Sequence, residues 1–167
     1  MQNDTQDIEA ERLRLELRLK LLETRERATS NFIDFAKYVW PEMLVGEHHR
    51  IIAEAFDRVI EGKCKRLMIA MPPRHGKSQL GSYLFPAYLM GKIPQSKLIV
   101  GSHTAELAQR FGRMIRNLVD EERYRELFPD IGLSADSKAS GRWNTKNGGE
   151  AFYVGVVYLW SAAAITA

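Results

Sequence analysis

The 167-residue sequence predicts an α/β fold, in which a parallel sheet is flanked by helices, a helical extension precedes the sheet and a hairpin follows it. Three observations predict this fold. Two apolar runs, 67–71 and 97–102, each precede a segment of helical periodicity, and this β-α-β-α order is typical of parallel sheets. Residues 8–27 are rich in helix-forming side chains. Asn147 and Gly148 separate two runs of β-prone residues, which is a strong hairpin signal.

Composition indicates an ordinary globular protein. Hydrophobic residues make up 45% of the chain and charged residues 27%, and the length is sufficient for one domain with a core of its own. The net charge of +3 permits an acidic partner such as nucleic acid without requiring one. The single cysteine, Cys64, excludes an internal disulfide framework and is typical of a reducing compartment.

Residues 1–29 are predicted to form a helical extension. Leucines at alternate positions suggest a strand by period alone, but Leu, Glu, Arg and Lys are strong helix formers, so we expect a helix from about 8 to 27. Two roles stay open for it, a solvated extension, which is favoured, or a contact with a neighbouring subunit. The expected helix has two apolar edges, Leu13/Leu17/Leu21 and Leu15/Leu19/Leu22.

Further helices are predicted from capping residues and from apolar side chains at helical spacing. Asn31 and Thr104 are of the type that accepts hydrogen bonds from the first turn of a helix, and Pro86 predicts a kink. The expected helices lie at about 31–40, 47–61, 78–91, 104–120 and 121–128.

The apolar run 67–71 is predicted to be a buried strand. Pro72 and Pro73 end it, because proline is excluded from the interior of both strands and helices. Gly76-Lys77-Ser78 then opens a helical run. Strand, short loop, Gly-Lys-Ser and helix is the layout of a phosphate-binding loop.

The residue types in this loop suit a polyphosphate. A helix N-terminus offers backbone N–H groups and a favourable dipole, and Gly76 lets the backbone approach closely. Lys77 is a compact cation suited to the β- and γ-phosphates, and the Ser78 hydroxyl is suited to Mg²⁺. We therefore expect Mg·ATP to bind here. The predicted nucleotide-binding residues are Pro73, Arg74, His75, Gly76, Lys77, Ser78 and Gln79.

The loop departs from the usual pattern of Gly, four residues and Gly-Lys-Ser/Thr. The first Gly would fall at Met71, and Pro72 and Pro73 remove two N–H donors. The alternative is a strand–turn–helix corner that carries Gly-Lys-Ser by chance. We favour the phosphate-binding interpretation because the tripeptide lies where the predicted strand ends and the helix begins.

Several segments resemble the large terminase subunits of tailed bacteriophages, the motors that package DNA. The string at 66–78, Arg-Leu-Met-Ile-Ala-Met-Pro-Pro-Arg-His-Gly-Lys-Ser, resembles their Walker A region, which tolerates loss of the first glycine and often carries an arginine such as Arg74. Weaker similarity covers the rest of 32–156. It lies in Ile99-Val100-Gly101-Ser102-His103-Thr104, Leu107-Ala108, Gly112, Gly141-Arg142-Trp143-Asn144-Thr145 and Gly148-Gly149-Glu150.

The resemblance implies a partial P-loop NTPase domain at 30–156, which hydrolyses ATP to move double-stranded DNA into a capsid. It implies Arg74 and Lys77 as catalytic residues and Ser78 as a Mg²⁺ ligand, and it brings segment 40–50 near the adenine. The implied partners are DNA, a small terminase subunit and the portal of the procapsid, with other copies of the chain as a further partner. The expected location is the cytoplasm of the host cell, with no membrane partner.

The sequence also departs from the family. In terminases the hairpin is followed by an apolar strand that ends in paired acids, the Walker B element, and later by a nuclease domain. Here the tail 157–167 has no carboxylate, so the chain resembles the first part of the ATPase domain, truncated. Glu150 is poorly suited to replace those acids, because it lies in a predicted turn beside two glycines. We expect the chain alone to be inactive and poorly soluble.

Other functions stay open beside the packaging motor. The loop alone is compatible with a helicase-like ATPase, a phosphotransferase or an inactive nucleotide-binding fragment. Adjacent His48 and His49 point about 100° apart on a helix, which disfavours chelation of a metal. Arg110, Arg113 and Arg116 recur every third residue and either form a solvated face or contact DNA phosphates.

Overall fold

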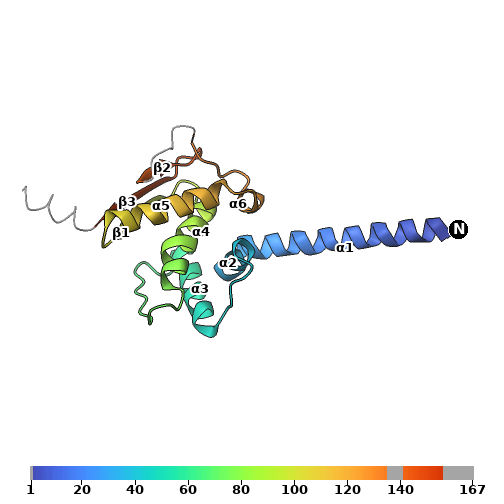
Figure 1. The fold of residues 1–167 in the computed structure, drawn as a ribbon, viewed down its shortest axis with the longest axis horizontal. Coiled ribbons are helices and arrows are strands. Elements are labelled where there is room, and N and C mark those ends of the chain that lie inside the picture. Colours follow the sequence, from blue (N-terminus) through green and yellow to red (C-terminus); the bar gives the residue numbers. More distant parts are fainter. Residues whose placement is uncertain (1, 135–140, 156–167) are drawn as a thin grey trace, which may run out of the picture.

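The computed structural model describes residues 2–134 and 141–155. Within these ranges the protein is a mixed α/β structure of six α-helices, one π-helical segment and a small sheet of three strands (Figure 1). The elements are α1 (Gln2–Ser30), α2 (Phe32–Val39), α3 (Glu47–Ile60), η1 (Gln79–Leu84), α4 (Phe85–Lys92), β1 (Lys97–Ser102), α5 (Ala105–Asp120), α6 (Glu122–Leu127), β2 (Arg142–Asn144) and β3 (Glu150–Gly155).

The helical extension is confirmed, and α1 projects from the body of the molecule as a single long helix (Figure 1). Its leucines are exposed, Leu15 and Leu19 by 57% and 58%, and the two leucine edges lie on opposite sides of the helix. Charged side chains fill the space between the edges. Within the described residues, no helix combines the length and apolar character needed to cross a bilayer.

Aromatic side chains from the helices form the centre of the core. Phe32 of α2 lies edge-on to Phe56 of α3, with ring centroids 5.0 Å apart, and Phe35 contacts Tyr88 of α4 at 5.0 Å. The predicted cap is confirmed, because the Asn31 side chain accepts a hydrogen bond from the backbone N–H of Asp34 at 3.0 Å. These contacts pack α2 against both α3 and α4.

The sheet has the order β1-β3-β2, with β1 and β3 parallel and β2 antiparallel to β3. The second predicted strand and the hairpin are therefore confirmed. Helix α5 begins at the predicted cap, where Thr104 Oγ1 accepts from the N–H of Leu107 at 3.2 Å, and it covers one face of the sheet (Figure 1). On the other face, Ile99 and Phe152 lie side by side in register and are 77% and 45% exposed.

The prediction of a buried strand at 67–71 is wrong. No ladder forms there in the described part of the chain, and Met68 is 93% exposed. The segment instead runs past α3, where it lines a cavity of about 270 Å³ with Ile51 and Ile52. A strand exists only if a neighbour supplies hydrogen bonds, and β1 pairs with β3 rather than with this segment. The expected sheet of parallel strands is thus a mixed one.

The irregularity expected at Pro86 takes the form of a π-helical segment. In η1 the chain makes wider turns, and the N–H of Phe85 donates to the carbonyl of Leu80, five residues earlier. Pro86 lies in the first turn of α4, which continues η1 without a break, and proline has no N–H to donate to the preceding turn. The other predicted helices are confirmed, whereas the apolar tail from Val156 onward lies outside the described residues.

Candidate nucleotide-binding site

The loop that joins α3 to η1 turns sharply just before its Gly-Lys-Ser tripeptide. Pro72 and Pro73 restrict their own φ angles and keep the preceding residues extended. Arg74 then adopts φ +65° and Gly76 φ +83°, both in the left-handed region. For Gly76 this conformation carries no steric penalty, but for Arg74 it is strained. Strain of this kind persists where the surrounding structure holds the backbone in place.

A helical turn begins directly after this bend. Lys77 and Ser78 are helical, and the N–H of Leu80 donates to the carbonyl of Gly76 at 2.8 Å. The N–H groups of the first turn have no partner within a helix and are therefore suited to bind an anion. A cavity of about 410 Å³ opens at this helix start. It is lined by Met71, Pro72, Pro73, Arg74, Gly76, Lys77, Ser78 and Gln79.

This cavity brings together six of the seven residues that the sequence predicts to bind the nucleotide. The side chains of Arg74, Lys77 and Ser78 are exposed, so a cation pair and a hydroxyl are accessible from solvent. His75 is the exception, because its side chain turns back on the loop, where Nδ1 lies 2.8 Å from the carbonyl oxygen of Pro73. The cavity thus offers backbone amides, two cations and a hydroxyl, which are groups that suit an anion.

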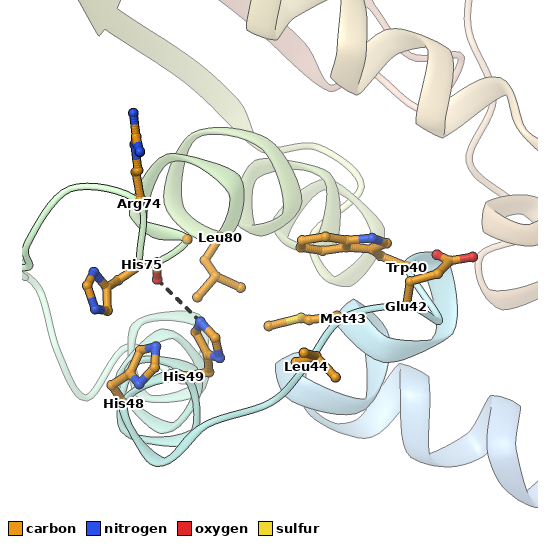
Figure 2. Close-up of a pocket in the computed structure, with 10 residues that line it drawn as sticks. Trp40, Glu42, Met43, Leu44, His48, His49, Arg74, His75 and Leu80 are labelled. Carbon is orange, nitrogen blue, oxygen red and sulfur yellow. Dashed lines mark hydrogen bonds between the residues drawn. The ribbon is translucent and has the colours of Figure 1, made fainter.

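A second cavity of about 410 Å³ lies on the other side of the loop and shares Arg74 and Gly76 with the first. Figure 2 shows Trp40, Met43 and Leu44 across this cavity from the three histidines. The complete lining is Trp40, Glu42, Met43, Leu44, His48, His49, Arg74, His75, Gly76 and Leu80. An aromatic ring and apolar side chains in a concave site are groups that suit a planar apolar ligand.

Three histidines gather at the edge of this second cavity. The ring centroids of His48 and His49 are 3.9 Å apart, and those of His48 and His75 are 5.9 Å apart (Figure 2). Partial loss of solvent, followed by repulsion from the other two rings, lowers the pKa of His48 and favours its neutral form. Within the described residues, no group of three or more His, Cys, Asp and Glu side chains has the geometry of a metal site.

His49 connects the loop to α3. Its Nδ1 accepts from the backbone N–H of Gly46 at 3.0 Å, and its Nε2 lies 3.3 Å from the carbonyl oxygen of His75 (Figure 2). The sequence suggested His49 as a metal ligand or as part of the segment 40–50 near the adenine, and this role was missed. The available signal was its position, three residues after Gly46, where a side chain is able to reach back to the residue that precedes the helix.

Glu150 does not lie where a Walker B acid would, at the carboxyl ends of the parallel strands. It is the first residue of β3, opposite Lys97 at the start of β1, and its carboxylate pairs with Lys97 and Arg142, each at 3.4 Å. The carboxyl ends of these parallel strands, at Ser102 and Gly155, form the opposite edge of the sheet. Ligands of open parallel sheets bind at the carboxyl edge, and neither of the two strands ends there in a carboxylate.

Two of the three arginines proposed for DNA lie on the side of α5 away from its buried stripe. Arg110 and Arg113 are exposed, and Arg116 is half-buried. The buried stripe of α5 consists of Ala108, Gly112, Ile115, Leu118 and Val119, and it faces the core. None of the three arginines lines either of the two cavities at the loop.

Comparison with known protein families, with characterised proteins and with solved structures gave no match.

Proposed function

We propose that this protein binds Mg·ATP at the loop 73–79, as the N-terminal ATPase portion of a DNA-packaging motor of the large terminase type. One observation carries the first half of this proposal. The left-handed turn at Arg74 and Gly76 directs the start of a helix, with Lys77 and Ser78 exposed, into a cavity beside an apolar cavity that contains Trp40. The resemblance of residues 66–78 to the Walker A region supports the second half.

In this proposal, different residues of the chain bind the phosphates, the Mg²⁺ ion and the adenine. The first-turn amides and Lys77 bind the β- and γ-phosphates, and Ser78 provides one ligand of Mg²⁺. Trp40, Met43 and Leu44 receive the adenine, and Arg74 approaches the γ-phosphate in the transition state. Mg²⁺ supplies charge neutralisation between the phosphates when it is bound.

Calorimetric titration of ATP with Mg²⁺ into the chain and into Lys77→Ala tests nucleotide binding. We expect the wild-type chain to bind, and the variant to lose at least about tenfold in affinity, because a charge-assisted hydrogen bond contributes about 1.5–3 kcal/mol. Lys92→Ala is a matched control that also removes one lysine. Lys92 lines neither cavity, and its Nζ donates to the carbonyl of Thr29 at the end of α1. Equal affinity in wild type and Lys77→Ala would refute the proposed site.

We propose further that this chain by itself does not turn over ATP at a useful rate. Phosphoryl transfer to water requires the metal to be held on two sides and the water to be aligned. Ser78 offers one side, while Glu150 is paired with Lys97 and Arg142 at the amino edge of the sheet. Steady phosphate release by the purified chain, abolished by Lys77→Ala, would contradict this expectation and favour a self-sufficient P-loop enzyme.

The motor itself is distinguished from a phosphotransferase or a helicase-like ATPase by its response to DNA. A longer protein that contains this chain should hydrolyse ATP faster when double-stranded DNA is present. Substitution of Arg110 and Arg113 by alanine should reduce the stimulation and the salt dependence of DNA binding. The same substitutions at Arg12 and Arg14 on α1 serve as the charge-matched control. Equal stimulation in both double variants would remove α5 from the DNA surface.

A further inference from the structure

We infer that His49 is a positioning residue, which holds the phosphate loop in its binding conformation through hydrogen bonds at both ring nitrogens. The inference rests on the proposed function in that the loop is taken to bind phosphates. Its geometric part, that His49 fixes the path of the loop, stands on the contacts of this side chain alone. Those contacts reach in two directions, to the start of α3 and to the bend of the loop.

The two partners of His49 determine which ring nitrogen carries the proton. The backbone N–H of Gly46 is a donor, so Nδ1, at 3.0 Å, must accept and is unprotonated. The partner of Nε2 is the carbonyl oxygen of His75, which only accepts, so Nε2 must carry the hydrogen and donate it across 3.3 Å. Both bonds form together only in the neutral ring with its proton on Nε2.

The bond to His75 falls at the most constrained point of the loop. His75 lies between Arg74 and Gly76, which both have left-handed backbone, at φ +65° and +83°. A bond to the carbonyl between them opposes relaxation of the strained Arg74 to an ordinary conformation. The path of the backbone into Lys77 and Ser78 follows from this bend.

The imidazole also limits the loop by contact. A β-carbon placed on Gly76 would lie 3.2 Å from Nε2 of His49, so the ring closes over a residue that has no side chain. His49 therefore forms a hydrogen bond with the backbone at His75, and its ring limits by steric contact how far the backbone can move at Gly76. Two contacts on adjacent residues define a position more tightly than either contact alone.

The other end of this connection is anchored in the core. Gly46 precedes α3 and His49 is its third residue, so the ring occupies the place of a capping side chain at the start of the helix. Helix α3 is itself held by the buried side chains Ile52, Ala53 and Phe56. The conformation of an exposed loop is thereby tied to the packed part of the molecule. Such preorganisation raises affinity by reducing the ordering cost of binding.

Two substitutions of His49 separate capping of α3 from positioning of the loop. Glutamine at this position is a capping-box residue, whose oxygen accepts from Gly46 while its amide group donates to His75. Asparagine retains an acceptor for Gly46 but is too short to reach His75. His103→Gln is the matched control, because His103 is an exposed histidine that lines neither of the two cavities.

The first measurement is calorimetric binding of Mg·ATP and pyrophosphate to the full chain. We expect His49→Asn to lose about tenfold in affinity for both ligands, as one hydrogen bond predicts. His49→Gln and His103→Gln should remain within about threefold of the wild type. Unchanged pyrophosphate binding in His49→Asn, or an equal loss of ATP binding in His49→Gln, would overturn the inference.

The second measurement requires no ligand. Trypsin cleaves after Arg74, and the rate of this cut, identified by mass spectrometry, reports how often the loop opens. We expect His49→Asn to be cut faster at Arg74 than the wild type and both glutamine variants, with equal melting temperatures. Unchanged cleavage in His49→Asn would refute the positioning role. If the wild type binds neither ATP nor pyrophosphate, the proposed function fails, and the cleavage rates alone decide the role of His49.

Discussion

A β-carbon on Gly155 would lie 2.5 Å from the backbone nitrogen of Ala105 and 2.9 Å from its α-carbon. The last residue of β3 is thus pressed against the first residue of α5. Backbone atoms form this contact, so neither side is able to give way by changing a side-chain rotamer. The close approach of β3 and α5 holds the helix on the sheet.

We expect Gly155→Ala to destabilise the protein strongly, by about 2 kcal/mol or more, because overpacking against backbone forces the strand and the helix apart. Gly132→Ala is the control, since a β-carbon there would meet only the flexible end of the Lys146 side chain, at 3.5 Å. Urea denaturation of both variants measures the difference. Equal stability would indicate that β3 and α5 are free to separate.

Arg74 combines a strained left-handed backbone with a charged guanidinium group, and two substitutions separate these properties. Arg74→Gly removes the guanidinium and also the penalty of φ +65°, whereas Arg74→Ala removes the guanidinium alone. The glycine variant should therefore be as stable as the alanine variant or more stable, by up to about 1 kcal/mol. Thermal unfolding gives this comparison.

The two Arg74 variants should behave alike in hydrolysis by a longer protein that contains a complete site. If the guanidinium stabilises the γ-phosphate in the transition state, both should lose most of the turnover rate. A glycine variant that keeps full turnover would show that Arg74 serves the shape of the loop and not the chemistry.

The ionisation of Asp57 makes the stability of the fold depend on pH. Burial raises the pKa of this carboxyl, and the hydrogen bond that it accepts from the N–H of Phe32, at 3.0 Å, opposes the rise without cancelling it. A raised pKa means that the folded state binds the proton more tightly than the unfolded state. The stability that the protonated Asp57 contributes to the fold is therefore fully present below the pKa of the unfolded state, about 3.9. It is lost as the pH rises through the pKa of Asp57 in the folded state.

Asp57→Asn should consequently be more stable than the wild type at pH 7, because the amide oxygen still accepts from Phe32 and carries no charge to bury. Its stability should also fall less than that of the wild type as the pH rises from 4. Asp57→Ala is the informative comparison, since it leaves the N–H of the fully buried Phe32 unpaired at a cost of about 1–3 kcal/mol. Chemical denaturation at several pH values measures all three. A less stable Asp57→Asn at pH 7 would mean that the charge itself stabilises the fold.

The sequence predicts the local elements well, because their signals are local. Helix propensity outweighed the alternating leucines of α1, and Asn31 and Thr104 cap the helices that they were expected to cap. The strand predicted at 67–71 failed because pairing is a property of two segments, and an apolar run contains no information about its neighbour. The loop at Arg74 and Gly76 was predictable from residue types, whereas the bond from His49 to His75 joins residues 26 positions apart.

The attachment of α1 has a mechanical consequence. The base of this helix is held by Arg25, which pairs with Glu126 of α6 and donates to the hydroxyl of Tyr38 of α2 at 3.3 Å. A helix of 29 residues is about 43 Å long, so a rotation of about 5° at this base would carry the far end through about 4 Å. A helix held at one end in this way is a lever. A small change in the packing of α2 against α6 would therefore produce a larger displacement at the N-terminal end of α1.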